Sequence, residues 1–202
     1  MPGRRARRLH HVPRRDARDN RDALLAAVAS LLAEHGPGFA LTEVAERAGL
    51  SKATAYRHFP GPDEAIEAYF ETLTAGLTAA FDALGPQAGI EQLCAEWVRQ
   101  AAGWGPAAVY LRSPRGFLAR LDDGDEFIRA LYARLERCLD AAILAGVIPS
   151  QDLRYAVLLW ITIFDERVVV DLTASEHLTR AQATERLTAT LFAALHPREF
   201  RR

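Results

Sequence analysis

Apolar residues recur along the chain every three to four positions, which is the period of a helix, and no stretch alternates convincingly with the period of a strand. Glycine and proline separate these periodic stretches. The pattern predicts helices over the following residues: about 19–35, two short ones within 41–59, a long one from Pro62 to about Leu84, and others near 90–103, 106–112, 125–145, 152–172 and 176–195. The predicted fold class is therefore all-α.

The two short helices lie in the stretch LTEVAERAGLSKATAYRHF, residues 41–59. Helices this short are unstable alone, so packing must hold them. Gly49 permits a tight turn between them, and Thr42 and Ser51 are predicted to cap the first and the second helix. Val44 and Ala55 are expected to face the core. Two short helices joined in this way predict a helix-turn-helix unit.

In a helix-turn-helix unit the second helix enters the major groove of DNA and its N-terminal residues contact base edges. Lys52 and Thr54 carry suitable groups on the outward face, and Ala53 is small enough to let the helix sit deep. Donors that suit phosphate oxygens follow on the same helix. The predicted DNA-binding residues are Thr42, Ser51, Lys52, Ala53, Thr54, Tyr56, Arg57 and His58.

The charge of the chain is unevenly distributed. Residues 1–60 hold 11 Lys and Arg against 6 Asp and Glu, a net charge of +5, whereas the remainder hold 14 against 20, a net charge of −6. A basic front on an acidic body predicts an anionic partner for the front. Residues 1–15, MPGRRARRLHHVPRR, are predicted to be a flexible basic arm. The alternative is a tail that is only solvated.

The helix-turn-helix stretch resembles the TetR family of bacterial transcriptional regulators over about residues 20–70. The residues that carry the resemblance are Thr42, Val44-Ala45, Ala48-Gly49, Ser51, Thr54, Tyr56-x-His58-Phe59 and Ala65-Ile66. The resemblance implies a homodimer on a palindromic DNA operator, a four-helix interface between the C-terminal helices of two subunits, and a small-molecule effector bound in the C-terminal bundle. Pro62 departs from the family, in which many members carry a phosphate-binding lysine near the start of the fourth helix.

The predicted organisation has three parts. Residues 1–15 form the arm, residues 16–62 the three-helix DNA-binding domain, and residues 63–202 a helical domain for ligand binding and dimerisation. Segment 152–172 is apolar nearly all round, and Leu191 belongs to an apolar stripe on the last helix, so both are expected to support self-association. The alternative is a purely intramolecular core.

Aromatic residues gather in the middle of the chain, where they form either an ordinary core or the walls of a ligand cavity. The predicted ligand-binding residues are Trp97, Arg112, Trp160, Thr162, Phe164 and Asp165. Arg112 could instead be solvated, and Asp165 could belong to an ionic cluster with Glu166 and Arg167 at the dimer interface.

Other classes of protein fit the sequence less well. An enzyme such as a recombinase would need a catalytic region, and we find no Gly-x-Ser-x-Gly elbow, phosphate loop or His-Glu-x-x-His zinc helix. An interaction module that does not bind DNA leaves the basic front unexplained. We therefore predict a cytoplasmic, non-enzymatic DNA-binding regulator without metal, cofactor or membrane span. The two cysteines, Cys94 and Cys138, are expected to be reduced thiols in the core.

Overall fold

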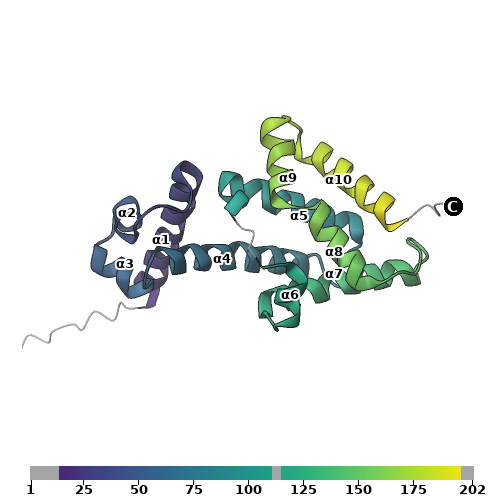
Figure 1. Ribbon diagram of the computed structural model, residues 1–202, viewed down its shortest axis with the longest axis horizontal. Coiled ribbons are helices and arrows are strands. Elements are labelled where there is room, and N and C mark those ends of the chain that lie inside the picture. The colour runs from purple at the N-terminus through teal and green to yellow at the C-terminus, as the bar shows by residue number, and fades with distance from the viewer. Residues whose placement is uncertain (1–13, 111–114, 197–202) are drawn as a thin grey trace, which may run out of the picture. The chain divides into compact units, whose positions relative to one another are not determined.

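The computed structural model describes residues 14–110 and 115–196, and over these residues it consists of helices and turns without a strand (Figure 1). The predicted all-α class is confirmed. The chain forms two compact units, Met1–Ala68 and Tyr69–Arg202. The division falls inside helix α4 (Pro62–Ala83), which begins in the first unit and ends in the second. Residues 1–13 of the predicted arm lie outside the described residues, and the predicted domain limits stay predictions.

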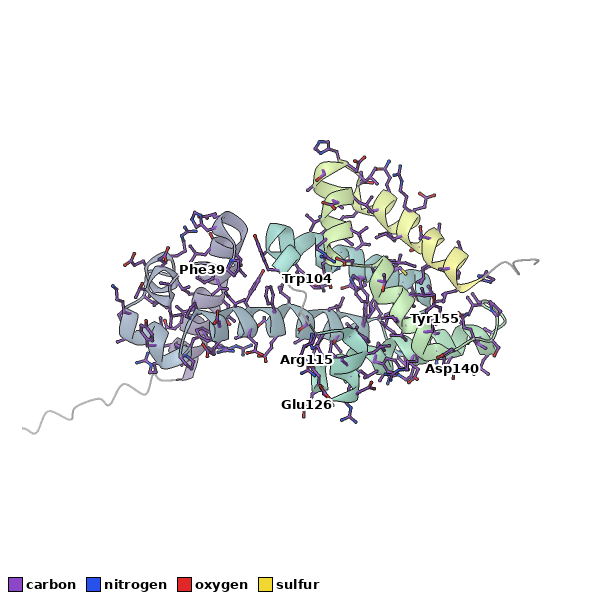
Figure 2. The ribbon with its side chains drawn as sticks, viewed as in Figure 1. Phe39, Trp104, Arg115, Glu126, Asp140 and Tyr155 are labelled. Atoms are coloured by element: carbon purple, nitrogen blue, oxygen red, sulfur yellow. The ribbon has the colours of Figure 1, made fainter. Side chains whose placement is uncertain are left out.

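Three helices precede α4 in the first unit: α1 (Arg14–His35), α2 (Leu41–Arg47) and α3 (Lys52–His58). Helix α1 begins before its predicted start and ends where predicted. Gly36 follows it with φ 73° and donates its N–H to the carbonyl of Leu32 at 3.0 Å, which closes the last turn. The buried apolar residues of this unit include Leu24, Val28, Leu31, Leu32, Phe39, Leu41, Val44, Ala45, Ala55 and Phe59. Phe39, labelled in Figure 2, lies in the connection between α1 and α2.

The turn between α2 and α3 is as tight as predicted. Gly49 has φ 67°, a conformation that a residue with a Cβ adopts only at a cost. Leu50 then donates its N–H to the carbonyl of Ala45 at 2.9 Å, so the chain turns back against the end of α2.

The capping residues were predicted correctly for α3 and wrongly for α2. The Ser51 hydroxyl accepts the Thr54 N–H at 3.1 Å, as predicted. Thr42, in contrast, is the second residue of α2, whose N-cap is Ala40. The helix starts earlier because Glu43 reaches back and accepts the Ala40 N–H at 2.8 Å, so that no Thr42 cap is needed.

The second unit continues from α4 with α5 (Ile90–Trp104), a 3₁₀ turn (Gly105–Tyr110), α6 (Phe117–Asp122), α7 (Glu126–Leu144), α8 (Leu153–Ile163), α9 (Glu166–Val170), a π turn (Asp171–Ser175) and α10 (Arg180–Leu195). Helix α10 packs against α5 and α8, and α7 packs against α8 (Figure 1). Helix α6 was not predicted, and the segment near 106–112 is a 3₁₀ turn over the part of it that the structure describes.

The single helix predicted over 152–172 is wrong, because the chain breaks between α8 and α9. Phe164 ends α8 with φ −91° and ψ 31°, and the Asp165 carboxylate accepts the Arg167 N–H at 2.9 Å as the N-cap of α9. An aspartate side chain can accept a backbone N–H and so start a new helix in place of continuing the previous one. The residues on either side of Asp165-Glu166-Arg167 are apolar, so the sequence pattern alone predicts one continuous helix. Within the described residues, no helix is long and apolar enough to cross a membrane.

Candidate functional site

Helix α3 presents one buried and one exposed face. Ala55 is fully buried, whereas Lys52, Ala53 and Arg57 are exposed and Tyr56 is 54% exposed. The exposed residues at the N-terminal end and along the outward face include most of those predicted to contact DNA. A helix placed in this way offers a cation, a small residue, a phenol and a guanidinium to a partner surface.

Thr54 is less free than predicted. It is half-buried, and its hydroxyl lies 2.9 Å from the Ser51 hydroxyl, with either group able to donate. The two side chains therefore hydrogen-bond to each other at the start of α3. The Thr54 methyl and the remaining lone pairs are what this residue can offer to a base edge.

His58 differs most from the simple picture of an exposed donor. Its Nε2 is buried without a hydrogen-bond partner in the described residues. Burial holds the pKa of His58 below its usual range, and the positive charges of Arg57 and Arg21 lower it further. The lowered pKa favours the neutral form of the His58 ring. Its neighbour Phe59 is buried, and the Arg21 guanidinium lies 4.9 Å from the Phe59 ring centroid.

An ion pair that joins α1 and α2 was not predicted. Arg47 donates Nη1 to Glu34 Oε1 at 2.7 Å and Nη2 to Glu34 Oε2 at 2.9 Å, a bidentate pair. Ser30 joins it, donating to Glu34 at 2.9 Å and accepting from Arg47. The side-chain hydrogen bond from Arg47 is the main reason that the pKa of Glu34 falls to about 2. The two charges lie 13 positions apart, so helical periodicity does not link them.

In the second unit the structure brings three of the predicted ligand-binding residues together. The Phe164 ring centroid lies 6.0 Å from that of Trp97 and 6.2 Å from that of Trp160. Phe81 of α4 extends the group, 5.9 Å from Trp97. These four side chains are at most 2% exposed, so they belong to the core. We call Phe81, Trp97, Trp160 and Phe164 the aromatic cluster.

The remaining predicted ligand residues do not join the aromatic cluster as free polar groups. Thr162 is exposed and donates its hydroxyl to the Leu158 carbonyl at 2.7 Å. Asp165 is buried and accepts from Arg167 Nη2 at 2.7 Å and from Arg167 Nε at 3.1 Å. Arg112 lies outside the described residues.

Arg134 on α7 is a functional candidate that periodicity missed. It is only 3% exposed, and its Nη2 donates to the Gly85 carbonyl at 3.0 Å, just beyond the end of α4. A cation there is favoured by the negative end of the helix dipole. Among the described residues, no group of His, Cys, Asp and Glu is suited to hold a metal ion.

Residues 24–69, which contain α2, α3 and the start of α4, match the family described as bacterial regulatory proteins, tetR family. Over this segment the chain is similar to TetR-family regulators. No curated protein matches it at the level of sequence. The resemblance seen in the helix-turn-helix motif is confirmed, and the match covers the part of the chain that carries α3.

Solved structures of bacterial regulators share the fold well beyond the matched segment. The fatty acid degradation regulator FadR from Bacillus halodurans superposes with a TM-score of 0.72 at 16% identity, over 89% of this chain and 97% of that one. FadR from Bacillus subtilis, solved in complex with stearoyl-CoA, superposes with a TM-score of 0.68 at 18% identity, over 87% of this chain and 99% of that one. The TetR-like regulator LfrR from Mycobacterium smegmatis, solved in complex with proflavine, superposes with a TM-score of 0.59 at 20% identity, over 89% of this chain and 99% of that one.

Proposed function

We propose that this protein is a ligand-responsive repressor of the TetR type that binds a palindromic DNA operator as a homodimer in the cytoplasm and is released by a small molecule. The observation that carries the proposal is helix α3, with Lys52, Ala53, Tyr56 and Arg57 exposed on one face of a TetR-type domain. The net charge of +5 over residues 1–60 supports it, because the same part of the chain must approach phosphates.

The side chains of α3 fall into two groups, those suited to contact bases and those suited to contact phosphates. Lys52 and Thr54 lie in the N-terminal turn, from which a recognition helix contacts base edges, and lysine donates well to guanine acceptors. Tyr56 and Arg57 follow with donors for phosphate oxygens, which fix register without carrying sequence information. Ser51 holds the start of the helix, and Ala53 leaves room for the groove. We assign His58 a phosphate contact through Nδ1–H, because Nε2 is buried.

The outer face of α8 supports the proposed dimer, whereas the leucine stripe of α10 does not. Leu187, Leu191 and Leu195 are at most 6% exposed, so the leucine stripe of α10 is an intramolecular core element. Helix α8 retains apolar side chains at helical spacing outside its buried face. Tyr155, labelled in Figure 2, is exposed. Leu158 and Leu159 are half-buried. A second copy that covers this face would remove apolar area from water.

Ligand release is proposed to act through α4. This helix begins at Pro62 directly after the DNA-binding elements, and Arg134 holds the chain at Gly85, just beyond its far end. Operator half-sites repeat at about 34–36 Å or multiples of it, so a small change in the angle of α4 in each subunit misaligns the two α3 helices. The relatives solved with stearoyl-CoA and with proflavine are regulators that bind small molecules, which supports a ligand in the second unit.

A gel shift on the DNA upstream of the protein's own coding region tests the proposal. We expect a specific complex that survives excess random DNA and is lost with Tyr56→Ala, whose phenol is exposed on α3. Circular dichroism of the variant checks its helix content. Tyr110→Ala is the matched control, because it removes another exposed phenol, but from the second unit, and should leave binding unchanged. Equal binding of specific and random DNA by the wild-type protein would contradict the proposal.

A further inference from the structure

The aromatic cluster contains two polar groups that its core position does not explain. Trp97 is 2% exposed and Trp160 is fully buried, and the Nε1–H of each has no acceptor among the described residues. Buried indole N–H groups usually find a hydrogen-bond partner, and where the protein supplies none, a water molecule or a bound ligand has to supply the acceptor. Two such donors lie on rings that contact the same Phe164 ring.

The chemistry of an indole N–H restricts what can bind it. The group donates and cannot accept, so its partner must offer a lone pair. The surroundings are apolar, with Phe81 and Phe164 against the indoles and Leu93 and Val157 in the same buried cluster. A partner that fits both requirements is an apolar molecule with an oxygen acceptor, such as a ketone, ester or carboxylate oxygen.

We propose that the Nε1–H groups of Trp97 and Trp160 bind an oxygen acceptor of an otherwise apolar effector. The inference rests on the proposed ligand-responsive function and specifies the effector class. It also changes the role expected from the sequence, where both tryptophans are apolar walls. Here they are the polar anchors, and Phe164 is an apolar ring that lies against both of them.

The position of the aromatic cluster links it to the elements that a ligand must move. Trp160 and Phe164 lie at the break between α8 and α9, where the helix is interrupted by the Asp165 cap. Trp97 contacts Phe81, which lies in the last turn of α4. A molecule that binds both indole N–H groups would therefore contact both the α8–α9 break and, through Trp97 and Phe81, the C-terminal end of α4.

Indole N–H resonances of the full-length protein provide a direct test, because the chain has only three tryptophans. The probes are 2-undecanone, its hydrocarbon analogue undecane, and decanoate. We expect 2-undecanone or decanoate to shift the Trp97 and Trp160 indole protons downfield and to leave Trp104 unchanged. The oxygen-bearing probe should bind about tenfold more tightly than undecane for each net hydrogen bond formed. A preference for decanoate over the ketone would identify the acceptor as an anion and support the same role.

Matched variants separate hydrogen bonding from packing. Trp97→Phe and Trp160→Phe retain an aromatic ring but remove the donor, so each should lower the affinity for the oxygen-bearing probe about tenfold and leave that for undecane unchanged. Trp104→Phe is the control and should change neither. Equal affinities for all three probes, or no binding of any, would overturn the inference. The wild-type probe series gives this answer even if a variant fails to fold.

The proposed function is tested separately by the gel shift. If the wild-type protein shows no specific operator binding, the proposed repressor function is contradicted, but the proposed role of the Trp97 and Trp160 N–H groups in ligand binding is not. Conversely, specific DNA binding without any oxygen-dependent indole shift would retain the DNA-binding function and reject the effector class.

Discussion

Arg47 on α2 and Glu34 on α1 form a bidentate ion pair, with N–O distances of 2.7 and 2.9 Å. Helix α2 has only seven residues and cannot hold its position by its own hydrogen bonds. The pair therefore helps to fix α2, against which α3 packs.

The pair predicts an acid-sensitive first unit. The folded pKa of Glu34 is about 2, below its ordinary value of 4.5, so the stability it contributes is complete above pH 4.5 and is lost as pH falls towards 2. Glu34→Gln should flatten this loss in urea unfolding curves measured from about pH 6 to about pH 2.5. Glu46→Gln is the matched control, because Glu46 is an exposed carboxylate on α2 without an ion pair in the described residues. Parallel pH profiles for wild type and Glu34→Gln would contradict the prediction.

Lys52 is expected to specify a base. Its exposed position in the first turn of α3 suits a contact to guanine, so Lys52→Ala should cost about 1–3 kcal/mol on the operator and relax the preference at one position of each half-site. Binding titrations against single-base operator variants measure the effect. Arg57→Ala, in contrast, should weaken binding to all sequences alike. A uniform loss with Lys52→Ala would place Lys52 on a phosphate instead.

The sequence predicts the first unit closely because its signals are local. Gly36 and Gly49 mark chain reversals that require positive φ, and Ser51 caps the helix that follows it. The second unit was predicted less well. The break at Asp165 lies inside an apolar run that a continuous helix fits equally well, and the contact of Arg134 with Gly85 joins residues 49 positions apart. Such contacts depend on tertiary packing, which periodicity does not contain.

The same distinction applies to the sites. The exposed face of α3 follows from helical spacing, because Ala55 fixes which side is buried. The meeting of Trp97, Trp160 and Phe164 was expected only as a set of cavity walls, and sequence offers no means to foresee that both indole donors lack an acceptor in the described residues. That property depends on where every neighbouring carbonyl points.

The two thiols predict a loss of stability in alkali. Burial raises the pKa of Cys94 to about 12 and that of Cys138 to about 11, from an ordinary 9.0. The unfolded chain releases these protons first, so stability is unaffected below about pH 9 and falls above it, by up to about 1.4 kcal/mol per pH unit for each thiol. The double variant Cys94→Ala/Cys138→Ala should show a shallower decline between about pH 9 and 11 in urea unfolding. Iodoacetamide should modify native wild type much more slowly than unfolded protein; rapid native labelling would show that the thiols are accessible.

Self-association should depend on the outer face of α8. Leu159→Glu places a charge on a half-buried position of this face, so we expect sedimentation to show monomer at micromolar concentration while circular dichroism still reports helix. Leu191→Ala is the informative contrast. Leu191 is fully buried within one protomer, and its truncation should lower the free energy of unfolding by about 2–5 kcal/mol instead. A Leu159→Glu protein that remains dimeric would move the interface elsewhere.

The arginines near the N-terminus predict a change in salt dependence. Pro62 stands where many TetR-family members carry a phosphate-binding lysine, and residues 1–13 carry Arg4, Arg5, Arg7 and Arg8. Each phosphate neutralised steepens the plot of log affinity against log salt by about 0.9, so two or three arginines engaged in each subunit contribute roughly 4–5 to the slope of a dimer. Deleting residues 2–13 should flatten the slope by that amount and weaken binding to random DNA in parallel, while base preference is kept because phosphate contacts carry no sequence information. Replacing the four arginines by glutamine is the control that keeps the chain length. An unchanged slope in both proteins would assign the phosphate contacts to α3 alone, with Arg57 as the principal cation.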